Sequence, residues 1–414
     1  MDRYPIDRRE FLKVAGATGV FVCGGCAGVG SREPIVLFDN TAAVRRFDLE
    51  IAALSVMEAD LAAQKTLPRR ERKLTYVDAT VGFDGEEYTG QVRFKGNSSL
   101  LKPLDAGQGK LPLKVKFGKD GRFHGLRKIN LQNNFKDPTM VRELLTTQLF
   151  ARNGAYAPRA VPVRVHVNGE YWGVYTLVEQ VDKTFLQDRF GDKTGNLYKP
   201  SGLGGQLKQF IPADLNKKTN RKAADYSDIE ALVGALADPA TAIGSVLDVS
   251  SFVSWLAVSA VVGHYDSYIG ARQNYYLYNN PATGLWSFIS WDHNISYGAS
   301  YLPGFGPDNI HTFDVARPFV GERPLTERVL AEPQWRAEYD ATVDRLVHGS
   351  LGEELIGPLH DAMRAWVYHE RTNRTLLTTP LDFDRNLDEG VLSHGNFMSP
   401  GVLDFIEKRR DFLG

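Results

Sequence analysis

The chain has 414 residues, of which 43% are hydrophobic and 24% are charged, as in an ordinary soluble globular protein. This length can bury a large core, either in one α+β unit or in two lobes. The formal net charge is −1, so the overall charge favours neither a nucleic-acid-binding protein nor one held electrostatically on a membrane surface. A local basic pocket is compatible with this balance.

Residues 1–33 have the pattern of an export signal. Arg8 and Arg9 precede "EFLK" and a short apolar stretch rich in Gly and Ala. This order resembles a twin-arginine signal, whose pathway carries folded proteins across the membrane. The apolar run is too short to span a bilayer as a permanent helix. We therefore expect an exported protein that is periplasmic, secreted or lipid-anchored at the cell surface.

Both cysteines, Cys23 and Cys26, lie in this segment. Cys26 follows two glycines at the end of the apolar stretch, which loosely resembles a bacterial lipoprotein processing site. Cleavage nearby without lipidation is the alternative, and the sequence leaves the two open. In either case the exported domain has no internal disulfide, so its stability depends on its core.

The first half of the exported chain is predicted to be antiparallel sheet with one helix. Residues 73–99 and 111–125 alternate apolar and polar side chains, each around a "DG" turn. Residues 161–167 and 171–180 form a further strand pair around an "NG" turn.

The helix of this half lies between two clear boundary signals. Asp137 is a good N-cap, Pro138 suits the first helical position and Gly154 suits the stop. Its apolar face is formed by Val141, Leu144, Leu145 and Leu149.

The second half is predicted to be mostly helical. Residues 227–236 open with a capping-box pattern, and residues 250–266 have the composition of a buried helix with a polar end. The glycine-rich segment 199–210 is the best candidate for a linker between the halves.

Three polar residues of the second half could carry chemistry. Asp266 follows a helix end, Asn274 comes eight residues later, and Asp292 ends the apolar strand "WSFIS". Phosphotransferases arrange their polar centre in this order: one Asp orients or deprotonates the attacking hydroxyl, and an Asn and a second Asp bind Mg²⁺. Each residue alone also fits a loop, turn or cap role.

Longer motifs resemble the CotH family, the spore-coat-protein-H-like atypical protein kinases. They include "VRFKGNSS", "INLQNNFKDPTMVRELL", "VHVNGEYWGVYTLVEQVDKTFL", "GNLYKP", "DSYIGARQNYYLYNN" and "WSFISWDHNISYG", and the resemblance covers residues 35–413. It implies a divergent two-lobed protein-kinase-like fold of the α+β class. The mostly antiparallel β N-lobe with one helix would span about 34–200, and the mostly helical C-lobe about 201–414.

The same resemblance implies an enzyme that binds ATP with Mg²⁺ or Mn²⁺ and phosphorylates Ser or Thr of a surface or coat protein. Asp266 matches the family's catalytic Asp, and Asn274 and Asp292 match its metal ligands. Trp286 would pack near the nucleotide, with plain core packing as the alternative.

The first half would supply the remaining nucleotide contacts. In "KGNSS", Lys95, Gly96 and Ser98 resemble the family's phosphate-side turn, although Lys95 replaces the usual Arg. We expect Lys114 to pair with the phosphates, and Lys116, on the same strand face, is the alternative that strand alternation does not exclude.

Three further residues complete the predicted nucleotide site. Glu143, on the predicted helix, could pair with the phosphate lysine, and a solvent-exposed helix face is its alternative. Backbone groups near Glu179 and Gln180 would meet the adenine, because "LVEQVD" lies between a strand and a helix.

One departure from the family pattern bears on activity. The family commonly has a second Asp two positions after the metal-binding Asp, and this chain has Asn294 there. Asn294 can still offer a carbonyl oxygen to a metal but brings no charge. Because an exported protein meets little ATP, a catalytically weak surface-binding protein, either an adhesin or a coat-assembly factor, is the second hypothesis. Adenylylation or amino-acid ligation at the same site is the third.

The export hypothesis predicts the effect of changing the arginine pair. Replacing Arg8 and Arg9 with Lys should leave the full-length precursor in the cytoplasm, because the pathway reads the arginines themselves. Cell fractionation and immunoblotting measure this, and normal export of the double variant would rule out the twin-arginine signal.

Overall fold

A computed structural model describes residues 36–39, 43–370, 377–393 and 397–414. The predicted export signal, with Cys23 and Cys26, lies outside the described residues. Val36–Gly414 forms one unit by its internal contacts. None of the helices in the described ranges is long and apolar enough to cross a membrane.

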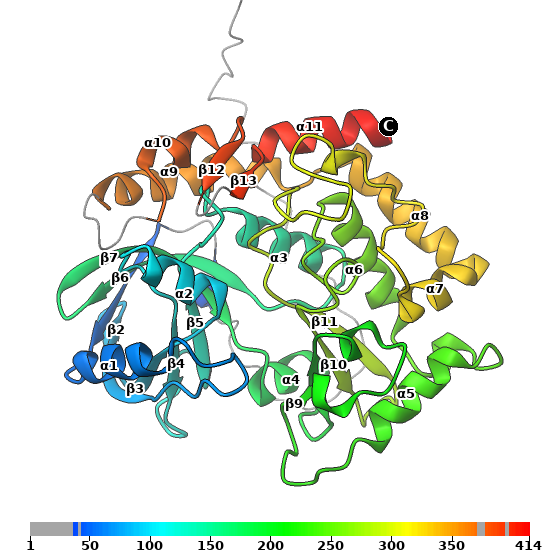
Figure 1. Ribbon diagram of the computed structural model, residues 1–414, viewed down its shortest axis with the longest axis horizontal. Helices are drawn as coiled ribbons and strands as arrows, with labels where there is room; N and C mark the ends of the chain where they lie inside the picture. Colours follow the sequence, from blue (N-terminus) through cyan, green and yellow to red (C-terminus); the bar gives the residue numbers. More distant parts are fainter. Residues whose placement is uncertain (1–35, 40–42, 371–376, 394–396) are drawn as a thin grey trace, which may run out of the picture. The chain divides into compact units, whose positions relative to one another are not determined.

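A closed barrel of seven strands occupies the first half of this unit (Figure 1). Its strands follow the order β1-β2-β3-β4-β5-β7-β6. Neighbours are antiparallel, except that β1 and β6 run parallel where the barrel closes. The strands are β1 (Arg45–Glu50), β2 (Val77–Phe83), β3 (Glu86–Phe94), β4 (Leu113–Phe117), β5 (Lys128–Gln132), β6 (Ala160–Val167) and β7 (Glu170–Glu179).

Strict alternation of side chains fills the barrel interior. In β4 the apolar Leu113, Val115 and Phe117 are buried, while Lys114 and Lys116 point to the outer face. The "NG" hairpin is confirmed: residues 168–169 join β6 to β7 with both φ angles positive, as a type I′ turn requires.

A second sheet of four strands lies in the other half of the unit. Its order is β11-β10-β8-β9, and the hydrogen-bonded neighbours are all antiparallel. The strands are β8 (Leu197–Pro200), β9 (Leu215–Lys217), β10 (Tyr275–Asn279) and β11 (Trp286–Ser290). A short pair, β12 (Val391–Ser393) and β13 (Phe397–Ser399), follows near the end of the chain.

The expected two-lobed kinase-like fold is wrong. The first-half strands close into a barrel, and a second sheet of four strands, β8 to β11, accompanies the helices of the second half. Closure depends on β1, which pairs with both β2 and β6 and so removes the two open edges. The residues "RRFDLE" of β1 do not form a typical strand pattern, because four of the six are charged. Segment 199–210, expected as a linker, begins inside β8.

Eleven α-helices of the described chain cover these sheets (Figure 1). They are α1 (Leu54–Gln64), α2 (Ser98–Asp105), α3 (Arg142–Arg152), α4 (Lys183–Phe190), α5 (Ser227–Ala237), α6 (Val249–Val261), α7 (Pro324–Ala331), α8 (Pro333–His348), α9 (Glu353–His369), α10 (Pro380–Arg385) and α11 (Val402–Leu413). The buried α6 packs against α8 and β11, and α3 lies between α6 and barrel strand β6 (Figure 1). The barrel and the second sheet therefore share one helical core.

Helix α3 begins four residues later than its sequence signals predicted, at Arg142 instead of Pro138. Met140 adopts a left-handed φ of 58°, which an α-helix cannot accommodate. The Asp137 carboxylate instead accepts a hydrogen bond from the Arg142 backbone at 3.0 Å and pairs with the Arg142 guanidinium at 2.6 Å. The predicted stop is confirmed, because Gly154 follows the C-cap with a φ of 79°.

A buried ion pair ties the barrel to α9. The Lys110 ammonium lies 2.9 Å from the Glu370 carboxylate, and the two side chains are 0% and 1% exposed. Glu370 also accepts the backbone N–H of Val174 in β7. Gly173 makes this approach possible, because a Cβ there would lie 2.5 Å from the Glu370 carboxyl carbon.

Breaking this pair on one side should destabilise the fold strongly. Lys110→Met leaves a buried carboxylate without its cation, so we expect a loss of about 3–5 kcal/mol in urea unfolding. Lys110→Met combined with Glu370→Gln should recover most of this loss, because Gln keeps the acceptor for Val174 without the charge. Lys408→Met, in an exposed pair with Asp404, is the control and should change stability by under about 1 kcal/mol. A double variant as unstable as the single one would contradict this account.

Candidate functional site

Asp266 and Asn274 meet in the loop between α6 and β10. The Asn274 amide nitrogen donates to the Asp266 backbone carbonyl at 2.7 Å and to its carboxylate at 3.0 Å. Gln273 donates to the other carboxylate oxygen at 2.7 Å. Asn274 has a left-handed φ of 57°, which its short polar side chain tolerates. Because its amide nitrogen is engaged, its amide oxygen is the atom left to bind a ligand.

The Asp266 carboxyl is less acidic than an ordinary aspartate. Burial raises its pKa to about 6, the hydrogen bond from Gln273 opposes this, and repulsion from Asp292 adds to the increase. Lys136 attracts the carboxylate and lowers the pKa. Asp266 and Asp292, 26 positions apart in the sequence, therefore belong to one site.

Asp292 stands just beyond the end of β11, with a left-handed φ of 63°. Its charge attracts the ammonium groups of Lys95 and Lys199, although burial lowers the pKa of both lysines. Within the described ranges, the Asp292 carboxylate accepts no hydrogen bond, so its oxygens are available to a ligand. A non-glycine residue in this conformation is commonly stabilised by surrounding contacts at a functional site.

The contact that fixes Asp292 comes from α3. The buried Glu143 carboxylate accepts the backbone N–H of His293 at 2.6 Å. His293 is held in turn by the Ser290 hydroxyl at 2.8 Å, and that hydroxyl accepts from the Trp255 indole at 2.9 Å. Glu143 thus bonds the segment that carries Asp292, whereas Lys114 bonds Gln180.

Asn294 is anchored to the loop that precedes α3. Its amide nitrogen donates to the backbone carbonyl of Phe135 at 2.7 Å, which leaves its amide oxygen for another partner. Across the described residues, no group of three or more His, Cys, Asp or Glu is arranged to hold a metal ion. The predicted metal ligands are a mixed set of one carboxylate, Asp292, and two amides, Asn274 and Asn294.

Lys114 points from the outer face of β4 toward β7. Its ammonium donates to the side-chain oxygen of Gln180, which also accepts from Asn130 at 3.3 Å. Burial and the nearby cations Lys95, Arg93, Lys128 and Lys199 hold its pKa well below the ordinary value. Lys116 instead bonds Gln91 at 3.3 Å.

The predicted phosphate-side turn joins β3 to α2. Lys95 lies in this turn with its ammonium 5.9 Å from the Trp291 ring. Gly96 has a φ of 97°, and a Cβ there would meet the Ser99 hydroxyl at 2.6 Å, so only glycine fits. Ser98 is the exposed first residue of α2.

The side chains of two predicted residues make contacts outside this group. The Glu179 carboxylate is buried and pairs with Arg159 at 2.7 Å and Arg189 at 3.2 Å. Trp286 is the first residue of β11, at the opposite end from Asp292, with its ring 6.0 Å from Tyr198.

Three residues of the site were missed from the sequence. Lys199 on β8 and Trp291 after β11 face each other, with 4.9 Å from the ammonium to the ring. Lys136 reaches toward Asp266 and lies 3.9 Å from the Phe397 ring. Lys199 stands in "GNLYKP", where strand alternation marks it as outward-facing but does not show what it faces.

The site as a whole is rich in cations that repel one another. The site contains fewer carboxylates, chiefly Asp266, Asp292, Glu143 and Asp182. Such a surface suits a multiply charged anion. The cations are Arg69, Arg93, Lys95, Lys114, Lys128, Lys199 and Lys218.

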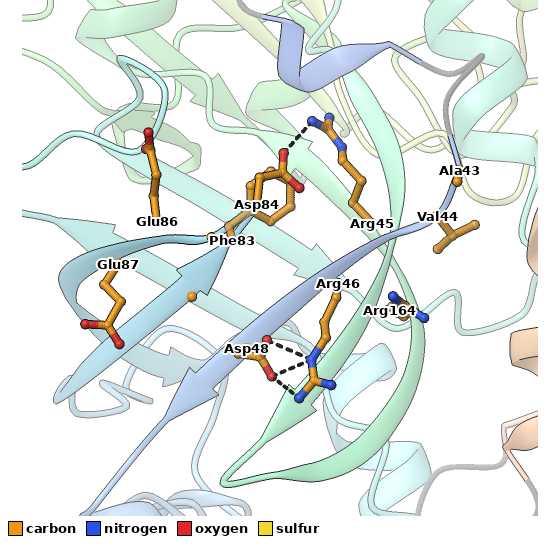
Figure 2. A pocket seen from close by; sticks show the side chains of 12 residues that line it. Ala43, Val44, Arg45, Arg46, Asp48, Phe83, Asp84, Glu86, Glu87 and Arg164 are labelled. Atoms are coloured by element: carbon orange, nitrogen blue, oxygen red, sulfur yellow. Dashed lines mark hydrogen bonds and ion pairs between the residues drawn. The ribbon is translucent and has the colours of Figure 1, made fainter.

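A separate cavity of about 560 Å³ opens on β1, the β2–β3 turn and Arg164 (Figure 2). Four of its charged residues pair with each other: Arg45 with Asp84 at 3.0 Å and Arg46 with Asp48 at 2.8 Å (Figure 2). None of the predicted site residues lines it.

Comparison with known proteins identifies the family. Residues 92–413 match the family described as "CotH kinase protein". The chain belongs to the CotH family. It is 27% identical to "Inner spore coat protein H" of Bacillus subtilis over 66% of this chain and 77% of that protein.

Two fungal CotH relatives are more distant. "Invasin CotH2" of Rhizopus delemar is 23% identical over 52% of this chain, and "Spore coat protein homolog 1" of the same organism is 21% identical over 65%. The matches cover 41% and 45% of these longer proteins, less than half of each.

The raised pKa of Asp266 predicts a pH-dependent stability. In the folded protein Asp266 holds its proton up to about pH 6, whereas the ordinary pKa is 3.8. Its contribution to stability is therefore fully present below about pH 4 and is lost as the pH rises through about 6. In EDTA, Asp266→Asn should gain stability relative to the parent protein by up to about 3 kcal/mol over this window.

Urea unfolding at a series of pH values measures this difference. Asp404→Asn, at an exposed ion pair, is the matched control and should show no such trend. A difference between Asp266→Asn and the parent that stays constant from pH 4 to pH 7 would show that burial does not perturb Asp266.

Proposed function

We propose that this CotH protein is an exported atypical protein kinase that transfers the γ-phosphate of ATP to a Ser or Thr hydroxyl of a surface or coat protein. The supporting observation is that Asp266 and Asp292, one with a raised pKa and one without a hydrogen-bond donor, share a site crowded with cations. Polyanionic ATP complements that charge, and a raised pKa suits a general base near neutral pH.

Asp266 acts on the acceptor in this proposal. The acceptor hydroxyl oxygen bonds to the γ-phosphorus, the bond from that phosphorus to the β–γ bridging oxygen breaks, and ADP leaves. The hydroxyl proton passes to Asp266, whose pKa of about 6 makes it a stronger base than an ordinary aspartate. The side chains of Gln273 and Asn274 hold the carboxylate in one orientation by hydrogen bonds.

The donor groups of the site fit Mg²⁺ or Mn²⁺. Asp292 offers an unbonded carboxylate, and Asn274 and Asn294 offer amide oxygens because their nitrogens are engaged. Bound there, the ion would neutralise charge on the phosphate oxygens. Lys95, Lys114 and the turn at Gly96 would meet the triphosphate, and the chain near Gln180 would meet the adenine.

The names of the relatives support a location at a surface or coat. One is a spore coat protein and another an invasin, and the export signal predicted over residues 1–33 agrees with this. We propose that the protein reaches the cell surface or a coat, with lipidation at Cys26 as one possible anchor. Its partner is then the acceptor protein.

A second function is favoured by Asn294. With Asn in place of the second metal-site Asp, the site carries one negative charge fewer, so metal binding weakens. The protein would then act as a surface-binding or coat-assembly factor with little catalysis, in keeping with the invasin relative. Transfer of label from γ- or α-labelled ATP separates kinase activity from adenylylation.

The kinase proposal predicts different effects at the two aspartates. A ligand at a hundred times its Kd adds about 2.7 kcal/mol of stability, so Mg-ATP should raise the melting temperature of the parent protein. Asp292→Ala should abolish this shift. Asp266→Asn should keep it while phosphate transfer falls about 10²–10⁴-fold, because only general-base assistance is lost.

Thermal melting and transfer of labelled γ-phosphate measure the two effects, with Asp404→Asn as the control. An unchanged Mg-ATP shift in Asp292→Ala would place the metal elsewhere. Loss of both binding and transfer in Asp266→Asn would make Asp266 a ligand or a structural residue.

A further inference from the structure

Lys199 is held between two aromatic rings in the second sheet. The pairing of β8 with β10 sets Tyr198 opposite Leu277, and this register continues to place Lys199 opposite Tyr276. The Lys199 ammonium lies 5.1 Å from the Tyr276 ring and 4.9 Å from the Trp291 ring. The two rings are nearly perpendicular, 5.7 Å apart, so they form two walls around the cation.

Lys199 has no ion-pair partner among the described residues, in contrast to Lys110. Lys110 is fully buried and bonded to Glu370 at 2.9 Å. Asp292 attracts the Lys199 ammonium, whereas Lys218, Arg69 and Lys95 repel it. Burial lowers the pKa of Lys199 to about 7, because removal of the ammonium from water disfavours its charged form. A partly buried cation without an ion-pair partner suits an anionic ligand.

The position of Lys199 relative to Asp292 distinguishes it from Lys114. Lys114 is already bonded to Gln180, and the charges that act on it are other cations. Lys199 and Lys95 are the lysines attracted by Asp292, the proposed metal-side carboxylate. Phosphate oxygens that share a metal ion with Asp292 would therefore lie near Lys199.

We propose that Lys199 is the principal phosphate-binding lysine of this protein, held by Tyr276 and Trp291 to contact a polyphosphate chain. That the polyphosphate is the triphosphate of ATP rests on the proposed function. Lys114 then has a supporting role, in which it orients Gln180 and adds to the positive potential.

Binding of sodium tripolyphosphate to the full chain tests this assignment. The ligand is titrated in EDTA against a sodium chloride blank of equal ionic strength, and binding is followed by calorimetry and thermal melting. Lys199→Met should weaken tripolyphosphate binding about tenfold or more, because a charge-assisted contact is lost. Lys114→Met should weaken it less. Lys208→Met, at an exposed pair with Glu322, should leave it unchanged.

Without ligand, the melting temperature of Lys199→Met should be no lower than that of the parent protein, because the substitution removes a desolvated cation. If Lys199 had only a structural role, its replacement would lower the melting temperature. If Lys199→Met does not fold, Lys199→Gln replaces it, with the same expected loss of tripolyphosphate binding and the same expected melting behaviour. The assignment is overturned if the parent does not bind tripolyphosphate, or if Lys114→Met loses binding while Lys199→Met keeps it. Binding of tripolyphosphate that depends on Lys199, without any response to Mg-ATP, would uphold the lysine and refute the kinase proposal.

Discussion

The hydrogen bond from the His293 backbone to the Glu143 carboxylate is the constraint on which the site depends. It joins α3, which packs on the barrel, to the segment after β11, which belongs to the second sheet. Asp292 can keep its left-handed backbone only if the following peptide is held, and Glu143 holds it from a fully buried position. The polar residues brought together from both halves of the chain thus share one rigid support.

Electrostatic imbalance is the second organising feature. A folded protein normally pairs its buried charges, as this one does at Lys110 and Glu370 and at Arg142 and Asp137. At the candidate site the pairing is incomplete: lysines from β4, β8 and the β3–α2 turn depress one another's pKa. Stability is therefore lower here than full pairing would allow, and an anionic ligand is the group that would restore it.

Local patterns predicted local structure well. Alternation in "LPLKVKF" gave the orientation of Lys114, and the "NG" signal gave the β6–β7 hairpin. Of the three residues Asp266, Asn274 and Asp292, the first two share a hydrogen bond, and the charge of Asp292 acts on Asp266. Long-range strand pairing could not be predicted from the sequence. The parallel β1–β6 pairing that closes the barrel joins segments over a hundred residues apart, and the residue pattern of neither strand indicates its partner. The role of Glu143 depends on that same tertiary packing.

Asn294 has a structural role in the loop before α3. The Asn294 amide donates to the Phe135 carbonyl, a bond that an ionised aspartate could not form and would repel. Phe135 precedes Lys136, in a loop where Asn134, Lys136 and Met140 all have left-handed backbones. Asn294 therefore helps to hold a strained loop whose lysine attracts Asp266.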